Sequence, residues 1–153
     1  MTDRTELLEE LAATWHRDIP LAAAMGIGVE RYDGATLATR APLQPNRNLH
    51  GTAFAGSLFS LCVLTGWGAL WLAFRERGLP GVIVVADARI QYRKAVSGDL
   101  ICRCTRDAGA LATSLAQFES TGRLRLDLAC TIDAGEKRAV SFTGTYVVRA
   151  EHR

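Results

Sequence analysis

The sequence predicts an α+β fold in which a curled antiparallel β-sheet wraps around one long central helix. The first observation is a run of 23 residues without a charged side chain, from Thr52 to Phe74, which is long enough for a helix that is apolar on all sides. The second is the chain from Val82 onward, where stretches typical of strands alternate with polar or glycine-containing turns at even spacing. A helix that is apolar all round must be covered on nearly every side, and a strongly curled sheet provides that cover.

The first third of the chain predicts a helix, a turn and a hairpin. Leucines recur at helical spacing over about residues 5–16, and glutamates lie near the start, so we expect an amphipathic helix there. Pro20 interrupts that pattern, and we expect a short turn over residues 21–25. The Asp33-Gly34 pair favours a tight turn, which predicts a β-hairpin over residues 27–41.

The middle of the chain predicts an irregular loop and the central helix. Residues 42–50 combine Pro, Asn, Gln and Arg, which is typical of a loop. The charge-free helix is expected over about residues 53–77, because Gly78 and Pro80 then end it. The remaining chain predicts antiparallel strands over residues 82–95, 99–106, 110–120, 124–132 and 138–149.

Length and composition indicate a single domain over residues 1–153. Of its 153 residues 48% are hydrophobic and 22% are charged, so the chain can bury a core of its own. The formal net charge of +2 is too small to indicate a nucleic-acid partner. The four cysteines and three histidines lack the spacing of a zinc site, and we expect no metal ion.

The charge-free run also raises the question of a membrane, because 23 residues can span a bilayer. Glycine, serine and threonine residues interrupt the run, and strand-like segments flank it, so we favour a helix buried in its own domain. The N-terminus is charged and shows no secretory signal. We therefore read the cysteines as reduced thiols and expect a cytoplasmic protein.

The junction from Asn48 to Gly56 carries the clearest chemical signal. A polar, glycine-containing turn leads there into the N-terminus of the apolar helix, where unpaired amide N–H groups and the positive end of the helix dipole coincide. An acyl thioester needs such a place, because its carbonyl oxygen requires fixed donors and its acyl part requires apolar room. The candidate set is Asn48 and His50 as catalytic residues, with Gly51, Thr52, Ala55 and Gly56 at an oxyanion-binding helix N-terminus.

Ordinary structural roles remain open for these residues. Asn48 suits a loop or a helix cap, and His50 could hold the loop by hydrogen bonding. Thr52 also suits a helix cap, and Gly56 could simply allow close helix packing.

The residues around this junction resemble the hotdog thioesterase superfamily. Residues 45–58 (PNRNLHGTAFAGSL), Trp67-Gly68 and residues 86–92 (ADARIQY) look like the thioesterase-like domain of the YiiD C-terminal type, and the resemblance covers roughly residues 15–150. It implies a hotdog fold and a homodimer or dimer of dimers with sites between subunits. It also implies an acyl thioester of acyl carrier protein (ACP) or CoA as substrate. Phosphopantetheine then arrives with the substrate, and we expect no other cofactor.

A wider comparison shows where this chain departs from its relatives. Phenylacetate-type hotdog thioesterases have an Asn-x-His-Gly-Thr-x-His-Gly-Gly pattern, followed seven residues later by a catalytic aspartate on the central helix. Asn48 and His50 match that pattern, whereas Phe54 stands at its second histidine and Val63 at its aspartate. The comparison therefore implies that the donors are kept and that the helix carboxylate is missing.

The missing carboxylate favours decarboxylation over hydrolysis. Hydrolysis needs a base that activates water, and residues 52–74 contain no Asp, Glu or His. Loss of carbon dioxide from a malonyl thioester instead places negative charge on the thioester oxygen, which requires preorganised donors and no base. Stand-alone relatives include enzymes resembling malonyl-ACP decarboxylases of fatty-acid initiation, and we expect that reaction. Hydrolysis of acyl-CoA or acyl-ACP and non-catalytic binding of an acyl carrier are the alternatives.

Charged residues of the segment after the helix complete the candidate set. Asp87 lies after an apolar run and could act as a base in the pocket of a partner subunit, although a salt bridge to Arg89 is the simpler interpretation. Arg89, Arg93 and Lys94 could contact the phosphate of a pantetheine carrier, or they could form a solvated strand edge.

Overall fold

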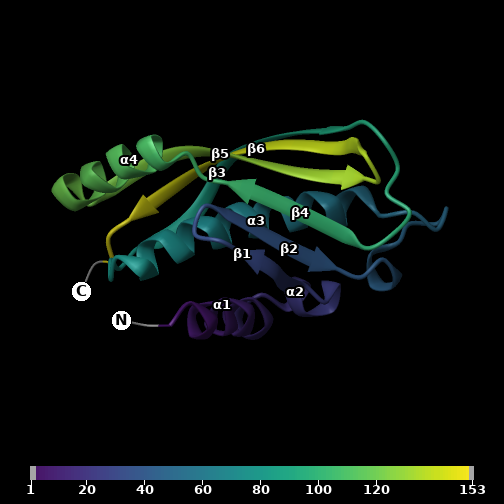
Figure 1. Ribbon diagram of the computed structural model, residues 1–153, viewed down its shortest axis with the longest axis horizontal. Helices are drawn as coiled ribbons and strands as arrows, with labels where there is room; N and C mark the ends of the chain where they lie inside the picture. Colours follow the sequence, from purple (N-terminus) through teal and green to yellow (C-terminus); the bar gives the residue numbers. More distant parts are fainter. Residues whose placement is uncertain (1–2, 152–153) are drawn as a thin grey trace.

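The computed structural model describes residues 3–151, in which a six-stranded antiparallel sheet wraps around one long helix (Figure 1). The strands are β1 (Gly28–Tyr32), β2 (Thr36–Ala41), β3 (Val82–Tyr92), β4 (Leu100–Thr105), β5 (Arg123–Ala134) and β6 (Lys137–Arg149). The helices are α1 (Arg4–Asp18), α2 (Pro20–Met25), α3 (Ala55–Glu76) and α4 (Ala108–Thr121), with a 3-10 turn η1 (Gln44–Asn46). The strand order is β1-β2-β4-β5-β6-β3. This arrangement confirms the predicted α+β fold class.

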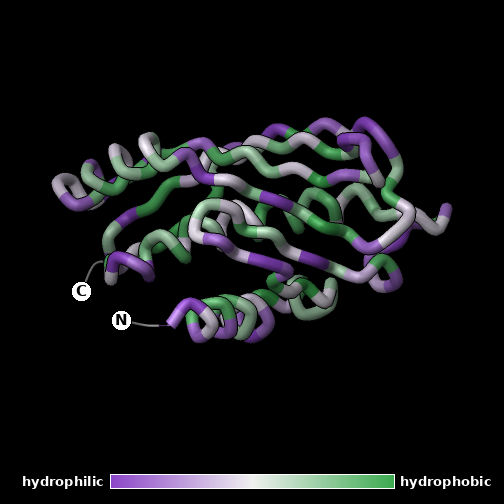
Figure 2. Tube along the Cα trace, in the orientation of Figure 1, coloured by the Kyte–Doolittle hydropathy of each residue, from purple (hydrophilic) through white to green (hydrophobic). Residues whose placement is uncertain are grey.

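The central helix α3 is buried because the sheet and α1 cover it from different sides. Trp15 of α1 lies against Gly68, and the Tyr146 ring of β6 lies against Gly66, so that a Cβ atom at either glycine would overlap an aromatic ring. These glycines let the neighbouring elements approach the helix axis closely. By length and composition α3 could span a membrane, yet 67% of its most apolar window is buried within the protein, as in the core helix of a globular domain. In Figure 2 the visible part of α3 is coloured mostly in the hydrophobic range.

The expected strand over residues 110–120 is wrong, because this segment is the helix α4. The Asp107 side chain caps it by accepting a hydrogen bond of 2.7 Å from the Ala110 amide, and Gly122 ends it in the left-handed region at φ 73°. Its buried side chains recur at helical spacing: Leu111, Ser114, Leu115 and Phe118.

Helix α4 closes one end of the core next to the longest strands. The ring of Phe118 packs edge to face against Phe74 of α3, with the ring centroids 4.8 Å apart. Strand β4 pairs with β5 only at residues 102–104, opposite residues 130–132, and α4 packs against β5. Helix α4 therefore covers the part of the core beside β5 that the short pairing with β4 leaves open.

Strand β3 is an edge strand with one long free side. It pairs with β6 over its whole length, and within residues 3–151 no strand pairs with its other side. A β-bulge between Val85 and Asp87 shifts the register, so that the side chains on either side of it reverse faces. Helix α3 also carries four apolar side chains that are only partly buried, and they form a stripe along the helix: Phe59, Val63, Trp67 and Trp71.

A buried guanidinium joins the hairpin of β1 and β2 to the C-terminal half of α3. Arg106 donates to the Ala69 carbonyl at 2.9 Å and to the Tyr32 hydroxyl at 2.7 Å. Tyr32 in turn donates to the Glu76 carboxylate. Burial, followed by the hydrogen bond to Glu76, raises the pKa of Tyr32 to about 12.

Candidate functional site

Asn48 organises the turn that precedes α3 through its side-chain amide. Its Oδ1 accepts hydrogen bonds from the backbone amides of His50 at 2.8 Å and Thr52 at 3.1 Å. Its Nδ2 donates to the Thr52 hydroxyl at 2.9 Å. One Nδ2 hydrogen therefore holds the turn, and the second has no acceptor within residues 3–151.

The backbone of the turn explains the glycine at position 51. The amide of Asn48 donates to the Thr52 carbonyl at 2.7 Å, and the amide of Gly51 donates back to the Asn48 carbonyl at 3.2 Å. Gly51 adopts a φ of 80°, in the left-handed region that side chains disfavour.

The N-terminus of α3 leaves two backbone donors unpaired. Phe54 occupies the N-cap position without a side-chain hydrogen bond, so Thr52 is not the cap that its residue type suggested. The amides of Ala53 and Phe54 donate to the Val96 and Asn46 carbonyls at 2.8 and 2.7 Å. The next two amides, of Ala55 and Gly56, have no acceptor within residues 3–151. They are the donors that a helix N-terminus offers to an anion or an oxyanion.

The ring of Phe54 explains why residue 56 is a glycine. A Cβ atom at Gly56 would overlap the Phe54 ring, which therefore lies directly over the first turn of α3. Phe54 is 54% exposed, so the ring stands at the surface beside the unpaired amides. Gly56 thus serves close packing, and its amide remains a candidate donor.

An open depression of about 380 Å³ lies beside this helix N-terminus. It brings together five of the candidate residues, Asn48, Thr52, Ala55, Arg93 and Lys94. Its other lining residues are Ala53, Leu58, Tyr92, Ala95 and Val96. The helix N-terminus and the residues that follow β3 thus line one site, which contains both hydrogen-bond donors and cations.

Tyr92 forms part of the wall of the depression and reaches the first turn of α3. Its hydroxyl donates to the Ala55 carbonyl at 3.0 Å, and burial raises its pKa. The hydroxyl is therefore protonated at neutral pH. Arg93 is oriented by a hydrogen bond of 2.7 Å from its guanidinium to Gln91.

The other five candidates do not line the depression: Gly51 and Gly56 lie in the adjoining turn and first helical turn, and His50, Asp87 and Arg89 lie apart from it. His50 is exposed at the tip of the turn, and its imidazole does not line the site. Asp87 and Arg89 lie on the outer face of the sheet, because they stand opposite Thr145 and Thr143, which alternate with the buried Gly144 and Tyr146.

The salt bridge expected between Asp87 and Arg89 is absent from residues 3–151. Asp87 instead accepts a hydrogen bond of 2.9 Å from the Ala88 amide. Both side chains are exposed, so their charges are available to another molecule.

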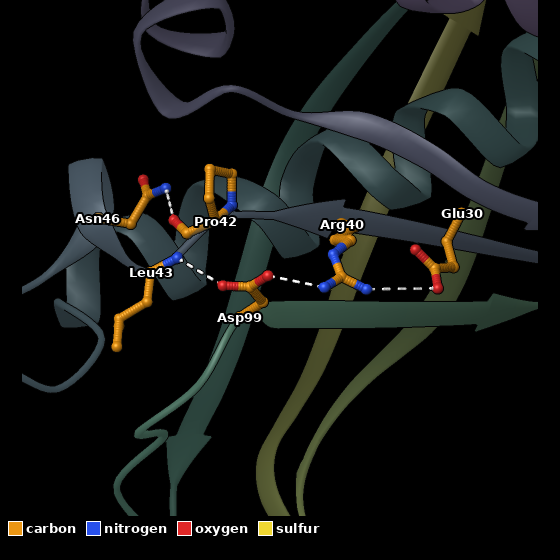
Figure 3. Close-up of polar contacts among 6 residues, drawn as sticks. All are labelled: Glu30, Arg40, Pro42, Leu43, Asn46 and Asp99. Carbon is orange, nitrogen blue, oxygen red and sulfur yellow. Dashed lines mark hydrogen bonds and ion pairs between the residues drawn. The ribbon is translucent and has the colours of Figure 1, made fainter.

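Two further residues, Asn46 and Asp99, hold the loop before the site (Figure 3). The buried Asn46 side chain donates to the carbonyls of Met25 at 2.9 Å and Pro42 at 2.7 Å. Asp99 accepts from the Leu43 amide at 3.1 Å and from Arg40 at 2.7 Å. The Leu43 hydrogen bond, followed by Arg40, lowers the pKa of Asp99, so this carboxylate is charged at neutral pH.

Sequence reasoning missed both anchors because nothing marks them locally. Asn46 contacts the carbonyl of Met25, 21 residues earlier, and Asp99 contacts Leu43, 56 residues earlier. The only available signal was residue type, since Asn and Asp often bond to backbone groups in loops.

The lining of the depression contains no carboxylate and no imidazole among the described residues. On α3 itself, Val63 is half-buried and its carbonyl accepts a hydrogen bond of 2.7 Å from Tyr146. The Cys62 thiol is buried, and its hydrogen bond to Cys102 together with burial raises its pKa far above the usual range. The site therefore offers donors and positive charge, and it offers no group that accepts a proton at neutral pH.

The fold and site together define a thioesterase-like protein of the hotdog fold. The model of the family described as "Putative thioesterase (yiiD_Cterm)" matches residues 8–150, and the chain belongs to this family. Thioesterases of this kind act on CoA or ACP thioesters.

Solved structures agree with this assignment. A protein of unknown function from Chlorobaculum tepidum TLS is 30% identical, with 96% of each chain covered and a TM-score of 0.91. A protein described as a putative thioesterase from Shewanella oneidensis is 33% identical, with 96% of this chain and 99% of that chain covered and a TM-score of 0.88. A thioesterase from Haemophilus influenzae shares the fold at 15% identity, with 95% and 94% covered and a TM-score of 0.68.

Proposed function

We propose that this protein decarboxylates the malonyl thioester of ACP to the acetyl thioester, in the cytoplasm, for the initiation of fatty-acid synthesis. The proposal rests on one observation: the site has free hydrogen-bond donors, and its described lining has no base. The amides of Ala55 and Gly56 and one Asn48 hydrogen are unpaired within residues 3–151, and the depression beside them has no carboxylate or imidazole in its lining. Decarboxylation requires the first feature and tolerates the second.

In the proposed reaction the thioester carbonyl oxygen accepts hydrogen bonds from these donors. The bond between the carboxylate carbon and the α-carbon breaks, and carbon dioxide leaves. The electron pair of that bond moves into the thioester, and negative charge develops on its oxygen as an enolate. Donors already fixed by the turn and the helix stabilise that charge without reorganisation. The α-carbon of the enolate then takes one proton from water, which gives the acetyl thioester.

Arg93 and Lys94 suit the phosphate of the pantetheine arm. They line the same depression as Asn48, and an arginine forms bidentate hydrogen bonds with phosphate oxygens. If either cation paired with the malonyl carboxylate, it would stabilise the ground state and slow the loss of carbon dioxide. We therefore assign both to the phosphate.

We further propose that two copies of the chain pair through the free edge of β3. An exposed edge of 11 residues readily pairs with a second strand, and the half-buried apolar stripe on α3 gives a second chain an apolar surface to cover. Asp87 and Arg89 flank Ala88 on that edge with opposite charges. An antiparallel pairing centred on Ala88 would place each aspartate opposite the partner's arginine. Two such dimers could associate further.

Hydrolysis of an acyl-CoA or acyl-ACP is the second candidate, and the thioesterase description of the family favours it. It requires a base, which Asp87 would have to supply to the site of a second chain. A third candidate is a non-catalytic module that binds an acyl carrier.

One assay separates the three candidates. The protein is incubated with malonyl-ACP and with acetyl-ACP, and the acyl mass and the free thiol are followed over time. Conversion of malonyl-ACP to acetyl-ACP without free thiol is expected. Release of free thiol from either substrate would refute the decarboxylase in favour of a hydrolase. If neither the acyl mass nor the free thiol changes while the protein still binds the carrier, the non-catalytic binding module is the remaining candidate.

A further inference from the structure

We propose that the outer face of β3 and β6 is a docking surface for an acidic amphipathic helix on the protein that carries the acyl thioester. This surface, the outer groove, is an open groove of about 680 Å³ lined by Val82, Val84, Ala86, Val147, Arg149, Ala150 and Glu151. The inference rests on the proposed thioester chemistry and names a partner for it. It concerns a surface distinct from the depression beside α3.

The floor of the outer groove is apolar although it faces away from the core. Val82 stands opposite Arg149 and Val84 opposite Val147, whereas the intervening Ile83 and Val148 are buried. Val82 and Val84 are 49% and 50% exposed. Two neighbouring strands thus present a row of valines to solvent, which is typical of a surface that binds another molecule.

The rim of the outer groove is basic. Arg123 of β5 stands directly opposite Arg149 of β6, and Arg125 stands opposite Val147. All three arginines are exposed, and none forms a salt bridge within residues 3–151. Like charges directly opposite each other in a sheet are destabilising, so a bound anionic group would relieve their repulsion.

The nearby carboxylates do not neutralise this rim. Asp127 and Asp87 both stand opposite Thr145, two residue pairs beyond the pair of Arg125 and Val147, and Asp127 accepts a hydrogen bond of 2.6 Å from Thr145 there. Glu151 lines the groove and forms no salt bridge with Arg149 within residues 3–151. Arg149 and Glu151 are the charged residues of the lining, and Arg123 and Arg125 on the neighbouring strand β5 add positive charge along that side of the outer groove.

An acidic amphipathic helix fits both features at once. Its apolar side chains, three and four residues apart, would lie on the valines, and carboxylates on its flanks would reach the arginines. A small free anion would use the arginines and leave the apolar floor exposed. The apolar floor therefore favours a protein helix over a free phosphate.

The outer groove and the depression lie at opposite ends of β3. Ten residues separate Val82 from Tyr92, or roughly 33 Å along the strand. Antiparallel pairing of β3 with a second copy brings the Val82 end of one chain beside the Tyr92 end of the other. A carrier docked on one protomer would then deliver its thioester to the site of the partner.

The test compares a protein-bound substrate with a small one. We expect the Arg123→Glu/Arg149→Glu double variant to lower kcat/KM for malonyl-ACP by at least about tenfold, because reversed rim charges slow association. Turnover of malonyl-pantetheine, which lacks the carrier protein, should be unchanged. Binding of holo-ACP without an acyl group, followed by fluorescence anisotropy, should weaken by the same factor. Arg103→Glu is the matched control, since Arg103 is an exposed arginine of β4 outside the groove, and it should change neither quantity.

Several outcomes would overturn the proposal. Unchanged kcat/KM and binding for ACP would remove the outer groove from carrier recognition, while turnover of malonyl-pantetheine would leave the proposed function intact. An equal loss with malonyl-CoA would assign the arginines to a phosphate group. A lower sedimentation coefficient of the double variant without ACP would make the groove an interface between copies of the chain. If neither thioester turns over in the wild type, the proposed function fails, and the holo-ACP binding measurement still decides the docking.

Delivery across the pair has its own test. The Arg123→Glu/Arg149→Glu variant keeps an intact site, and Asn48→Ala keeps an intact groove, so each alone is expected to turn over malonyl-ACP more slowly than wild type, by at least about tenfold. Mixed dimers of the two join an intact groove to the partner's intact site, and they should regain activity. No recovery in mixed dimers of demonstrated composition would overturn delivery across the pair.

Discussion

Replacing Asn48 by aspartate separates its chemical role from its structural one. Aspartate keeps the shape of the side chain and the Oδ1 acceptor for the amides of His50 and Thr52, at 2.8 and 3.1 Å. It removes the Nδ2 donor, whose second hydrogen is the one proposed to bind the thioester oxygen. The variant loses this donor and gains a negative charge beside the proposed oxyanion, and both changes should lower kcat, so a retained kcat would exclude the oxyanion role.

The expected magnitudes differ widely between folding and catalysis. Loss of the single hydrogen bond to the Thr52 hydroxyl costs about 0.5–1.5 kcal/mol. A negative charge near the N-terminus of α3 returns about 0.3–1 kcal/mol, so the free energy of unfolding should change by less than about 1 kcal/mol. Loss of one oxyanion donor lowers kcat by about 10²–10³-fold. Asn48→Ala loses all three side-chain hydrogen bonds of the turn and should also unfold about 2–3 kcal/mol more easily.

The assay measures kcat and KM for malonyl-ACP by acyl mass, together with thermal unfolding of each variant. We expect Asn48→Asp to unfold near the wild-type temperature, with a strongly reduced kcat. Asn48→Ala should unfold roughly 4–12 °C lower. If Asn48→Asp keeps kcat within about threefold of wild type, less than about 1 kcal/mol of transition-state stabilisation is lost, and the donor role of Asn48 is refuted.

Three further predictions concern the fold that supports the site. The pKa of Tyr32 is raised to about 12, so its contribution to stability is complete below pH 10 and is lost as the pH rises towards 12. Over that range the free energy of unfolding should fall by up to roughly 2–3 kcal/mol. In denaturant titrations the Tyr32→Phe variant should show a smaller fall. Gly66→Ala should destabilise the protein by about 1–3 kcal/mol, because the Tyr146 ring that the new Cβ atom would meet is buried and hydrogen-bonded. Gly56→Ala should cost less than about 1 kcal/mol, because the exposed Phe54 ring can move aside. Equal losses of the two variants in chemical denaturation would contradict this contrast. Asn46→Ala should destabilise by about 2–4 kcal/mol, since two buried carbonyls lose their donor, and a change below about 1 kcal/mol would show that water replaces it.

The fold was predictable because its main constraint is visible in composition. A charge-free run of this length can only be a buried helix or a membrane span, and the helix expected over about residues 53–77 matches α3 within two residues at its start and one at its end. The strands around it follow from alternation and turn residues. The error at α4 arose because even spacing of turns suggested another strand. The helical signal was nevertheless present, in the cap at Asp107 and in the spacing of Leu111, Leu115 and Phe118.

The candidate residues that the structure places around one depression come from two separate segments of the sequence. Asn48, Thr52 and Ala55 lie in one motif, and the structure brings them to one depression together with Arg93 and Lys94. Anchors from distant segments, such as Asn46 and Asp99, depend on contacts that no local pattern encodes.

The position of Asp87 depends on a single extra residue in β3. Without a bulge, strict alternation from the buried Ile83 through Val85 would turn Asp87 towards α3. The bulge between Val85 and Asp87 turns the carboxylate to the outer face instead. Sequence alternation cannot reveal a bulge, so the face of this acid was open until the register was known.

The same bulge connects the edge strand to the proposed chemistry. After the reversal, Tyr92 is on the inner face, where its hydroxyl reaches the Ala55 carbonyl at the first turn of α3. One change of register thus moves an acid away from the helix and brings a protonated phenol to it. A hydrolase needs the acid near the thioester, and this register takes it away within the chain. Among the described residues, the lining of the depression supplies no base for hydrolysis, whereas the donors proposed to hold an enolate lie at its edge.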